Sequence, residues 1–153
     1  ALQKRFKKSQ VISLDFALPM LQKAKDIAKS ECGNPFMQVF KQLVSSADQG
    51  FLCADIENLP IKSQSIGLLW SNLAIQWCND LDIALQEFHR VLQPEGLLMF
   101  STFGPDTLKE LRTATYAGDA EHTSVSRFID MHDIGDALVR AGFSAPVLDV
   151  ERF

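Results

Sequence analysis

The sequence has little of what marks membrane, secreted or nucleic-acid-binding proteins. No apolar run approaches the roughly 20 residues that a membrane helix needs, and the charged N-terminus has no apolar stretch of the secretory type. The formal net charge of -4 does not suggest a nucleic-acid partner. The three cysteines are scattered, with no Cys-x-x-Cys pair, which is typical of reduced thiols. We therefore expect a cytoplasmic protein with neither a membrane nor a nucleic-acid partner.

Size and composition indicate one globular domain. The chain has 153 residues, of which 46% are hydrophobic and 22% charged, enough for a buried core. No histidine lies at a zinc-finger spacing from the cysteines, so no metal site is expected. The chain begins at Ala1 without an initiator methionine, which suggests a piece of a longer protein.

Short apolar segments alternate with amphipathic helical patterns along the whole chain. The predicted strands are residues 11–14, 51–54, 66–70, 97–100 and 146–150. The predicted helices are residues 19–33, 36–43, 80–93, 105–111 and 130–142, with caps at Asn79-Asp80 and at Asp130 and a break at Pro94-Glu95-Gly96. This alternation predicts an α/β fold, a parallel sheet with helices on both faces.

Acidic residues follow two successive predicted strands. Ligands of such sheets bind beyond the carboxyl ends of the strands. Asp15 could accept hydrogen bonds from both ribose hydroxyls, and Asp55 from an adenine amino group. Phe16 and Ile56 offer apolar contact to a purine. A turn or helix-cap role explains Asp15 alone equally well, but the two acids together favour a nucleoside ligand.

Four segments resemble motifs of the class I S-adenosylmethionine-dependent methyltransferases. Residues 14–21 resemble the acidic motif, 54–60 the adenine-contact motif, and 71–77 and 87–97 motifs II and III. The run Asn-Leu-Ala-Ile-Gln-Trp at 72–77 is the most specific. Together with 102–112, it is similar to enzymes that methylate the free carboxyl of malonyl-acyl carrier protein in biotin biosynthesis. The likeness extends from Val11 to the end.

The resemblance implies a Rossmann-like sheet with S-adenosylmethionine as cofactor. It assigns Asp15 to the cofactor's ribose, Asp55 and Ile56 to the adenine, and Asn72 to the methionine end, with Met20 and Phe16 near the adenine. The implied partner is an acidic acyl carrier protein with a malonyl group. The basic cluster at residues 4–8 could steer it, although such a cluster is usually a solvated edge.

Methyl transfer from a sulfonium to a carboxylate needs positioning and exclusion of water more than acid-base help. We therefore expect no catalytic acid or base. Gln76 and Trp77 could line the acceptor pocket, and Trp77 could equally be a core residue. Arg127, with Arg112 as the alternative, could orient the malonyl carboxylate through its bidentate guanidinium. A solvated surface arginine is the competing interpretation for each.

One family feature is missing. No Gly-x-Gly occurs, whereas the family has a glycine-rich loop after its first strand. We therefore expect residues 1–153 to form a single, incomplete methyltransferase domain, N-terminally truncated, that lacks the first strand and this loop. An exposed sheet edge would favour a dimer. The stretch 34–48 is longer than the link usual in the family that the chain resembles, and it has no assigned role.

Alternatives remain at this point. Residues 102–112 also resemble an arginine-hydroxylating assembly factor of mitochondrial complex I. A truncated, non-catalytic domain that only associates with a partner chain is a second alternative. A dehydrogenase is a weaker one, because an acid after the second strand also suits a nicotinamide ribose, but Asp55 and the run 72–77 argue against it.

Overall fold

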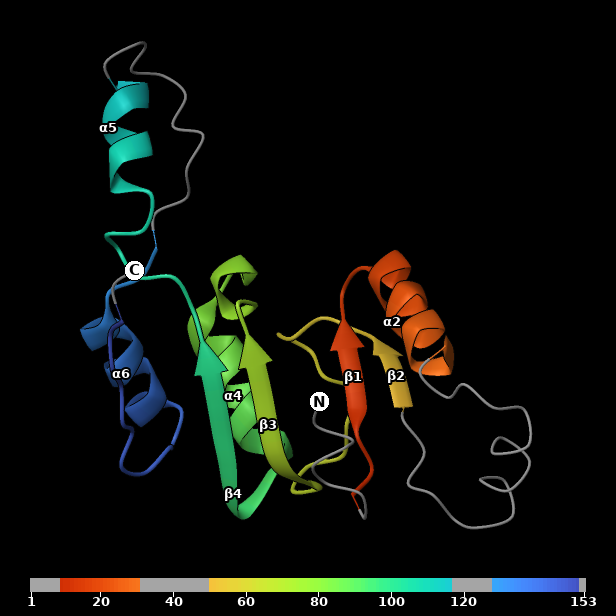
Figure 1. Ribbon diagram of the computed structural model, residues 1–153. Coiled ribbons are helices and arrows are strands. Elements are labelled where there is room, and N and C mark those ends of the chain that lie inside the picture. Colours follow the sequence, from red (N-terminus) through yellow and green to blue (C-terminus); the bar gives the residue numbers. More distant parts are fainter. Residues whose placement is uncertain (1–8, 31–49, 117–127, 152–153) are drawn as a thin grey trace, which may run out of the picture. The chain divides into compact units, whose positions relative to one another are not determined.

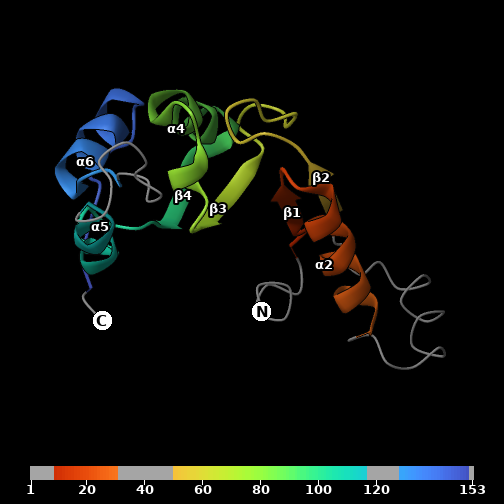
Figure 2. The ribbon, with the colours of Figure 1, turned by 90° about the horizontal axis from the view of Figure 1, so that it is seen from above.

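The structure is a computed structural model that describes residues 9–30, 50–116 and 128–151 (Figures 1 and 2). Its elements are β1 (Ile12–Asp15), α2 (Leu18–Ser30), β2 (Gly50–Cys53), β3 (Ile66–Asn72), the 3-10 turn η1 (Ile75–Trp77), α4 (Leu81–Val91), β4 (Leu92–Ser101), α5 (Lys109–Tyr116) and α6 (Met131–Arg140). They form two compact units, residues 1–55 and 56–153. The prediction of a single domain stays a prediction.

The first unit is a strand-helix-strand arrangement. β1 and β2 pair in parallel, with Ile12 opposite Gly50 and Asp15 opposite Cys53. The helix α2 contacts both strands and buries Leu21, which is only 6% exposed. Pro19 is the second residue of α2, where a missing N–H costs no intrahelical hydrogen bond. The predicted helix 36–43 and the predicted stop at Gly33 lie outside the described residues.

The second unit repeats this arrangement with longer strands. β3 and β4 pair in parallel from Ile66 opposite Leu92 to Asn72 opposite Ser101, and α4 connects them (Figure 2). The predicted parallel pairing is confirmed in both units. Within the described ranges each strand has a single neighbour, so the strands form two pairs where the sequence predicts one continuous sheet.

The core of the second unit lies where α4 contacts β4 and α6. The buried residues of the two helices recur at helical spacing, as an amphipathic face requires: Ala84, Leu85, Phe88 and Val91 on α4, and Ile134, Ala137 and Leu138 on α6. Both predicted caps are confirmed. The Asp80 side chain accepts from the N–H of Ile83 at 3.1 Å, and that of Asp130 from the N–H of His132 at 2.8 Å.

Gly142 ends the last helix, as its position in the sequence predicts. It lies one residue past the Ala141 cap and has a φ of +99°, which glycine adopts at little cost. The space beside it is also limited, because a Cβ there would lie 3.2 Å from the His89 ring. His89 itself packs edge-on against Phe143 with ring centroids 5.2 Å apart, so this histidine has a packing role.

Three predictions of secondary structure are wrong, two of them at the boundary of an element. Residues 94–96 do not separate helix from strand, because β4 begins directly at Leu92. An irregular register near its start and a φ of +65° at Glu95 absorb the Pro-Glu-Gly sequence. The helix predicted from Pro105 begins only at Lys109, because Leu108 adopts a φ of +56° that a right-handed helix excludes.

The third error is the predicted strand 146–150. The structure has no strand there, and Val147 is 93% exposed. A strand needs a hydrogen-bonded neighbour, and none among the described residues is available to this segment. Its run of apolar residues was therefore an insufficient signal.

Three large apolar side chains lie partly exposed on one face of the β3–β4 pair. Trp70, Leu97 and Met99 are each about half exposed, at 55%, 56% and 46%. Trp70 lies opposite Met99 in the register, so the three side chains share a face. In the described part of the chain, no helix has the length and apolar character to cross a membrane.

Candidate functional site

The carboxyl ends of β1 and β2 lie next to each other, as the nucleoside hypothesis requires. Asp15 is the last residue of β1 and lies opposite Cys53, the last residue of β2. The N–H of Ala54 donates to the Asp15 carbonyl oxygen at 3.2 Å and extends the pairing by one step. Asp55 follows at once, so both acids lie at the same end of the strand pair.

The Asp15 carboxylate also has a structural role. Its Oδ1 accepts from the N–H of Ala17 at 2.8 Å, an Asx-turn that leads the chain from β1 into α2. The turn role that the sequence suggested for Asp15 is therefore confirmed. Among the described residues, no group donates a hydrogen bond to Oδ2, which leaves that oxygen available to a ligand hydroxyl.

Two apolar side chains near this turn are exposed. Phe16 is 78% exposed and Met20 is 60% exposed. The Phe16 carbonyl accepts from the Cys53 thiol at 3.4 Å, which ties the residue after β1 to the end of β2. Exposed apolar groups beside an acid suit the face of a purine ring.

A second group of candidates lies at the carboxyl ends of β3 and β4. Asn72 and Ser101 are paired in the register, and the Ser101 hydroxyl donates to Oδ1 of Asn72 at 2.6 Å. Gln76 follows in the turn η1. Its Nε2 donates to the Leu73 carbonyl at 2.8 Å, and its Oε1 accepts from the Thr102 hydroxyl at 3.3 Å.

Trp77 is 74% exposed. Ile75, two residues earlier in η1, takes the buried position with 2% exposure. The interpretation of Trp77 as a core residue is therefore wrong, because the tight turn directs Ile75 inward instead. The tryptophan remains a candidate for contact with a ligand or a partner.

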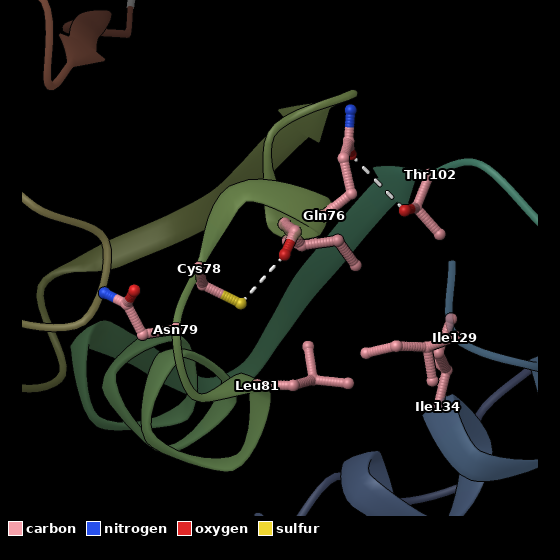
Figure 3. Close-up of a pocket in the computed structure, with 8 residues that line it drawn as sticks. Gln76, Cys78, Asn79, Leu81, Thr102, Ile129 and Ile134 are labelled. Atoms are coloured by element: carbon pink, nitrogen blue, oxygen red, sulfur yellow. Dashed lines mark hydrogen bonds between the residues drawn. The ribbon is translucent and has the colours of Figure 1, made fainter. Parts of the chain in front are cut away.

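An open pocket lies beside η1 (Figure 3). Its cavity volume is about 140 Å³. Its polar wall carries Gln76 and Thr102, while Leu81 points toward Ile129 and Ile134 on the apolar side (Figure 3). An opening with one polar and one apolar wall suits a narrow chain with amide and methylene groups.

The segment that follows Asp55 is held by groups that sequence reasoning missed. Glu57 accepts from the N–H groups of Asn79 and Asp80. Farther along, the Arg90 guanidinium forms a bidentate ion pair with Glu87. The Arg90 hydrogen bond, aided by the Leu59 N–H, lowers the pKa of Glu87 against the opposing effect of burial. The i, i+3 spacing of Glu87 and Arg90 was the available signal.

Several candidates have no described geometry. Arg127 and the basic residues 4–8 lie outside the described residues, as does the stretch 34–48. Arg112 lies in α5. In the ranges that the structure describes, no three His, Cys, Asp or Glu side chains gather as metal ligands would.

The residues present fit the adenosine half of S-adenosylmethionine. An acid at the end of β1 has one carboxylate oxygen available, an acid follows β2, and exposed apolar side chains lie beside the first. These are the groups that a ribose diol and a purine need. The cofactor assignment implied by the motifs therefore agrees with the local geometry of the first unit.

Known proteins are similar to this sequence over all or nearly all of its length. Malonyl-acyl-carrier-protein O-methyltransferase from Methylovorus sp. (strain MP688) is 61% identical over 153 residues, which are 100% of this chain and 48% of that protein. The protein of the same name from Gallionella capsiferriformans (strain ES-2) is 50% identical over 150 residues, 98% of this chain and 48% of its own length. The chain thus spans about half the length of the relatives it matches.

Solved structures share the fold. An S-adenosylmethionine-dependent methyltransferase from Mesorhizobium loti matches with a TM-score of 0.58 and 20% identity, over 88% of this chain and 63% of its own. The cyclase SpnF matches with a TM-score of 0.64 and 20% identity, over 90% and 43%. A cyclase on this fold illustrates that fold alone does not define the reaction.

A family match covers most of the chain. Residues 1–100 match the family described as "Methyltransferase domain". This match, with the solved structures above, confirms the predicted Rossmann-like methyltransferase fold. The chain belongs to the methyltransferase-domain family.

Proposed function

We propose that this chain acts as an O-methyltransferase in the cytoplasm. Its substrate in this proposal is the free carboxyl of malonyl-acyl carrier protein, in biotin biosynthesis. The observation that carries the proposal is the 61% identity, over all 153 residues, to a protein named for that reaction. Such identity reaches well beyond the general fold. The alternative of an arginine hydroxylase is not favoured, because relatives at 50 to 61% identity carry the methyltransferase name.

The reaction needs little acid-base chemistry from the protein. When bound, S-adenosylmethionine supplies an electrophilic methyl group on a positively charged sulfur. A malonyl carboxylate oxygen would accept this methyl group, and the electron pair of the carbon–sulfur bond would stay on sulfur. No proton moves. The residues of this chain therefore act by binding, by alignment and by exclusion of water.

The acids of the first unit bind the adenosine in this proposal. Asp15 accepts from the ribose hydroxyls through Oδ2, while its Oδ1 keeps the turn into α2 in place. Asp55 accepts from the adenine amino group. Phe16, Met20 and Ile56 pack against the purine. Support comes from the parallel register that brings the ends of β1 and β2 together.

Asn72 holds the methionine end of the cofactor. Because its Oδ1 accepts from Ser101, the two N–H donors of its Nδ2 are directed elsewhere and suit a carboxylate. The hydrogen bond from Ser101 thus holds the amide in this orientation.

Gln76 and the pocket beside it receive the acceptor arm. Gln76 and Thr102 supply polar groups for the thioester and amides, and Ile129 and Ile134 pack against its methylenes. Trp77, exposed at the edge of η1, covers the arm where it leaves the pocket. Arg127 precedes Ile129 by two residues in the sequence and pairs with the malonyl carboxylate. If malonyl methylation is unchanged in an Arg127→Ala variant, this role is wrong.

The acyl carrier protein docks through charge. The basic cluster at residues 4–8, with the exposed Lys23 and Lys25 on α2, provides positive potential for an acidic partner. Raising the salt concentration should then slow association. A dimer through a sheet edge remains a separate proposal, and sedimentation of the full-length protein tests it.

The reaction itself is tested with the full-length protein, S-adenosylmethionine and malonyl-acyl carrier protein. We expect a methyl ester on the malonyl group, detected by mass spectrometry of the carrier protein. Acetyl-acyl carrier protein, which has no free carboxyl, is the matched control and should stay unmodified. Cofactor binding without methylation of the malonyl group would contradict the proposed substrate but leave the family assignment intact.

A further inference from the structure

The segment after Asp55 runs along α4 and is fastened to it at three places. We call residues 56–65 the strap. Its first fastening is Glu57, whose carboxylate accepts from the N–H groups of Asn79 and Asp80 at the N-terminus of α4. The helix dipole favours a carboxylate at this end. The residue directly before Glu57 is Ile56, one of the two residues that the proposed function assigns to the adenine.

The second fastening is the ion pair between Glu87 and Arg90, one turn before the end of α4. Glu87 accepts from the Leu59 N–H at 2.8 Å. Arg90 donates to the carbonyl oxygens of Leu59 and Ile61 at 2.8 and 2.9 Å. Leu59 is itself only 5% exposed. Folding removes water from these strap backbone groups. The pair supplies the hydrogen-bond partners that they would otherwise lack.

The third fastening closes the strap at the end of α4. The N–H of Gln64 donates to the Arg90 carbonyl, and the N–H of Ser65 donates to the Val91 carbonyl, each at 2.9 Å. These bonds satisfy carbonyls that the last helical turn leaves without intrahelical partners. Gln64 adopts a φ of +53° to make the turn. The strap is thus fixed at its start, middle and end.

We propose that Glu57 and the Glu87–Arg90 pair are positioning residues that set adenine selectivity by holding the strap. The proposal rests on the proposed function, because it takes Asp55 and Ile56 as the adenine contacts. Neither Glu57 nor Arg90 touches the cofactor in this account. They hold the backbone that continues directly from these two residues along the chain, and a contact held in place beforehand loses less entropy on binding.

The test compares two ligands that differ at the edge of the purine ring where the contact in question lies, at the 6-substituent and at the adjoining N1. S-adenosylhomocysteine carries the amino group that Asp55 accepts from. S-inosylhomocysteine carries a carbonyl oxygen there instead. The ratio of their dissociation constants, measured by calorimetric titration of the full-length protein, reports adenine selectivity. A general loss of folded protein lowers the apparent binding of both ligands alike and leaves this ratio unchanged.

Two variants release the strap at different places. Arg90→Lys keeps the charge but loses the planar fork that reaches two carbonyls and Glu87 at once. Glu57→Gln keeps the shape and removes the charge at the start of α4. We expect each variant to weaken binding of S-adenosylhomocysteine about tenfold and that of S-inosylhomocysteine much less, so that selectivity falls. In steady state, KM for S-adenosylmethionine should rise while kcat stays close to the original.

The matched control is Arg140→Lys. Arg140 also forms a bidentate pair with a carboxylate of α4, Asp82, at 3.0 and 3.1 Å, and neither of these hydrogen bonds involves a strap residue. Its selectivity should equal that of the unaltered protein. Because Glu57 and Arg90 act at separate fastenings, misfolding of one variant still leaves the other as a test.

One outcome overturns the proposal. The ratio of the two dissociation constants is unchanged in both folded variants, whether both affinities are retained or both fall equally. Failure of the proposed function looks different. In that case the unaltered protein does not bind S-adenosylhomocysteine, or binds it without preference over S-inosylhomocysteine.

Discussion

The hydroxyl of Ser101 donates to the side-chain oxygen of Asn72 across 2.6 Å. The two residues end neighbouring parallel strands and are paired in the register. In this arrangement the oxygen of the Asn72 amide faces Ser101, and its two N–H groups are left for a ligand. An amide with its N–H groups outward can bind a carboxylate, whereas the reversed amide cannot.

Removal of that bond should weaken cofactor binding. In a Ser101→Ala variant the Asn72 amide loses the partner that orients it, and we expect the affinity for S-adenosylhomocysteine to fall about 3- to 10-fold. Asn72→Asp should weaken binding further, because the new side-chain carboxylate would repel the carboxylate at the methionine end of the ligand. Calorimetric titration measures both. Thr113→Ala on α5 removes another exposed hydroxyl and should have no effect on binding. Equal affinity in all three variants would refute the role of Asn72.

The second unit should depend strongly on Leu85. This side chain has no exposed surface, so Leu85→Ala leaves a cavity and should lower the free energy of unfolding by about 2–5 kcal/mol. Ile83, two residues earlier on the same helix, is 45% exposed, and Ile83→Ala should cost much less. Urea unfolding of the full-length protein measures the difference. Similar losses in the two variants would mean that α4 does not bury the face seen here.

The cap at Asp80 should contribute measurably to α4. Its side chain accepts from the Ile83 N–H, and loss of such a cap in an Asp80→Ala variant costs about 1 kcal/mol. Asp80→Asn keeps an acceptor and should retain most of this stability. Thermal unfolding followed by circular dichroism distinguishes the two. Asn and Ala variants with the same unfolding temperature would show that the side chain adds nothing as a cap.

Acid should weaken the strap through Glu87. Its pKa is below the ordinary value of 4.5, first because of its hydrogen bond with Arg90. A carboxyl group with a lower pKa in the folded state stabilises the protein above its unfolded pKa. This contribution is lost as the pH falls from that value through the folded pKa. The free energy of unfolding should therefore drop less steeply over this window in Glu87→Gln than in the unaltered protein. Parallel pH profiles would contradict the assignment.

Local signals in the sequence predicted much of the fold. Asp80 and Asp130 precede amphipathic segments, and a side chain that caps a helix needs only its near neighbours. Gly142 follows from the same logic, because the end of a helix requires a backbone conformation that glycine adopts cheaply. The position of the two acids at the carboxyl ends of β1 and β2 could also be predicted, since parallel strands bring these ends together.

Features that depend on distant partners were not predicted. Val147 has strand-like neighbours in sequence, but a strand exists only where another strand pairs with it. The fastening of the strap joins Leu59 to Arg90, 31 residues apart, and no local pattern encodes that distance. Trp77 and Ile75 are both apolar, and only the geometry of the turn decides which is buried.

The proposed cofactor site depends most on Asp15 as a ligand for the cofactor ribose and not only as a turn residue. Asp15→Asn separates the two roles, because the amide oxygen can still accept from the Ala17 N–H while the negative charge is lost. The measurement is calorimetric titration of S-adenosylhomocysteine into the full-length protein and this variant, together with their unfolding temperatures. We expect affinity to fall at least about tenfold at an unchanged unfolding temperature. Undiminished affinity in the folded variant would contradict the assignment of this site.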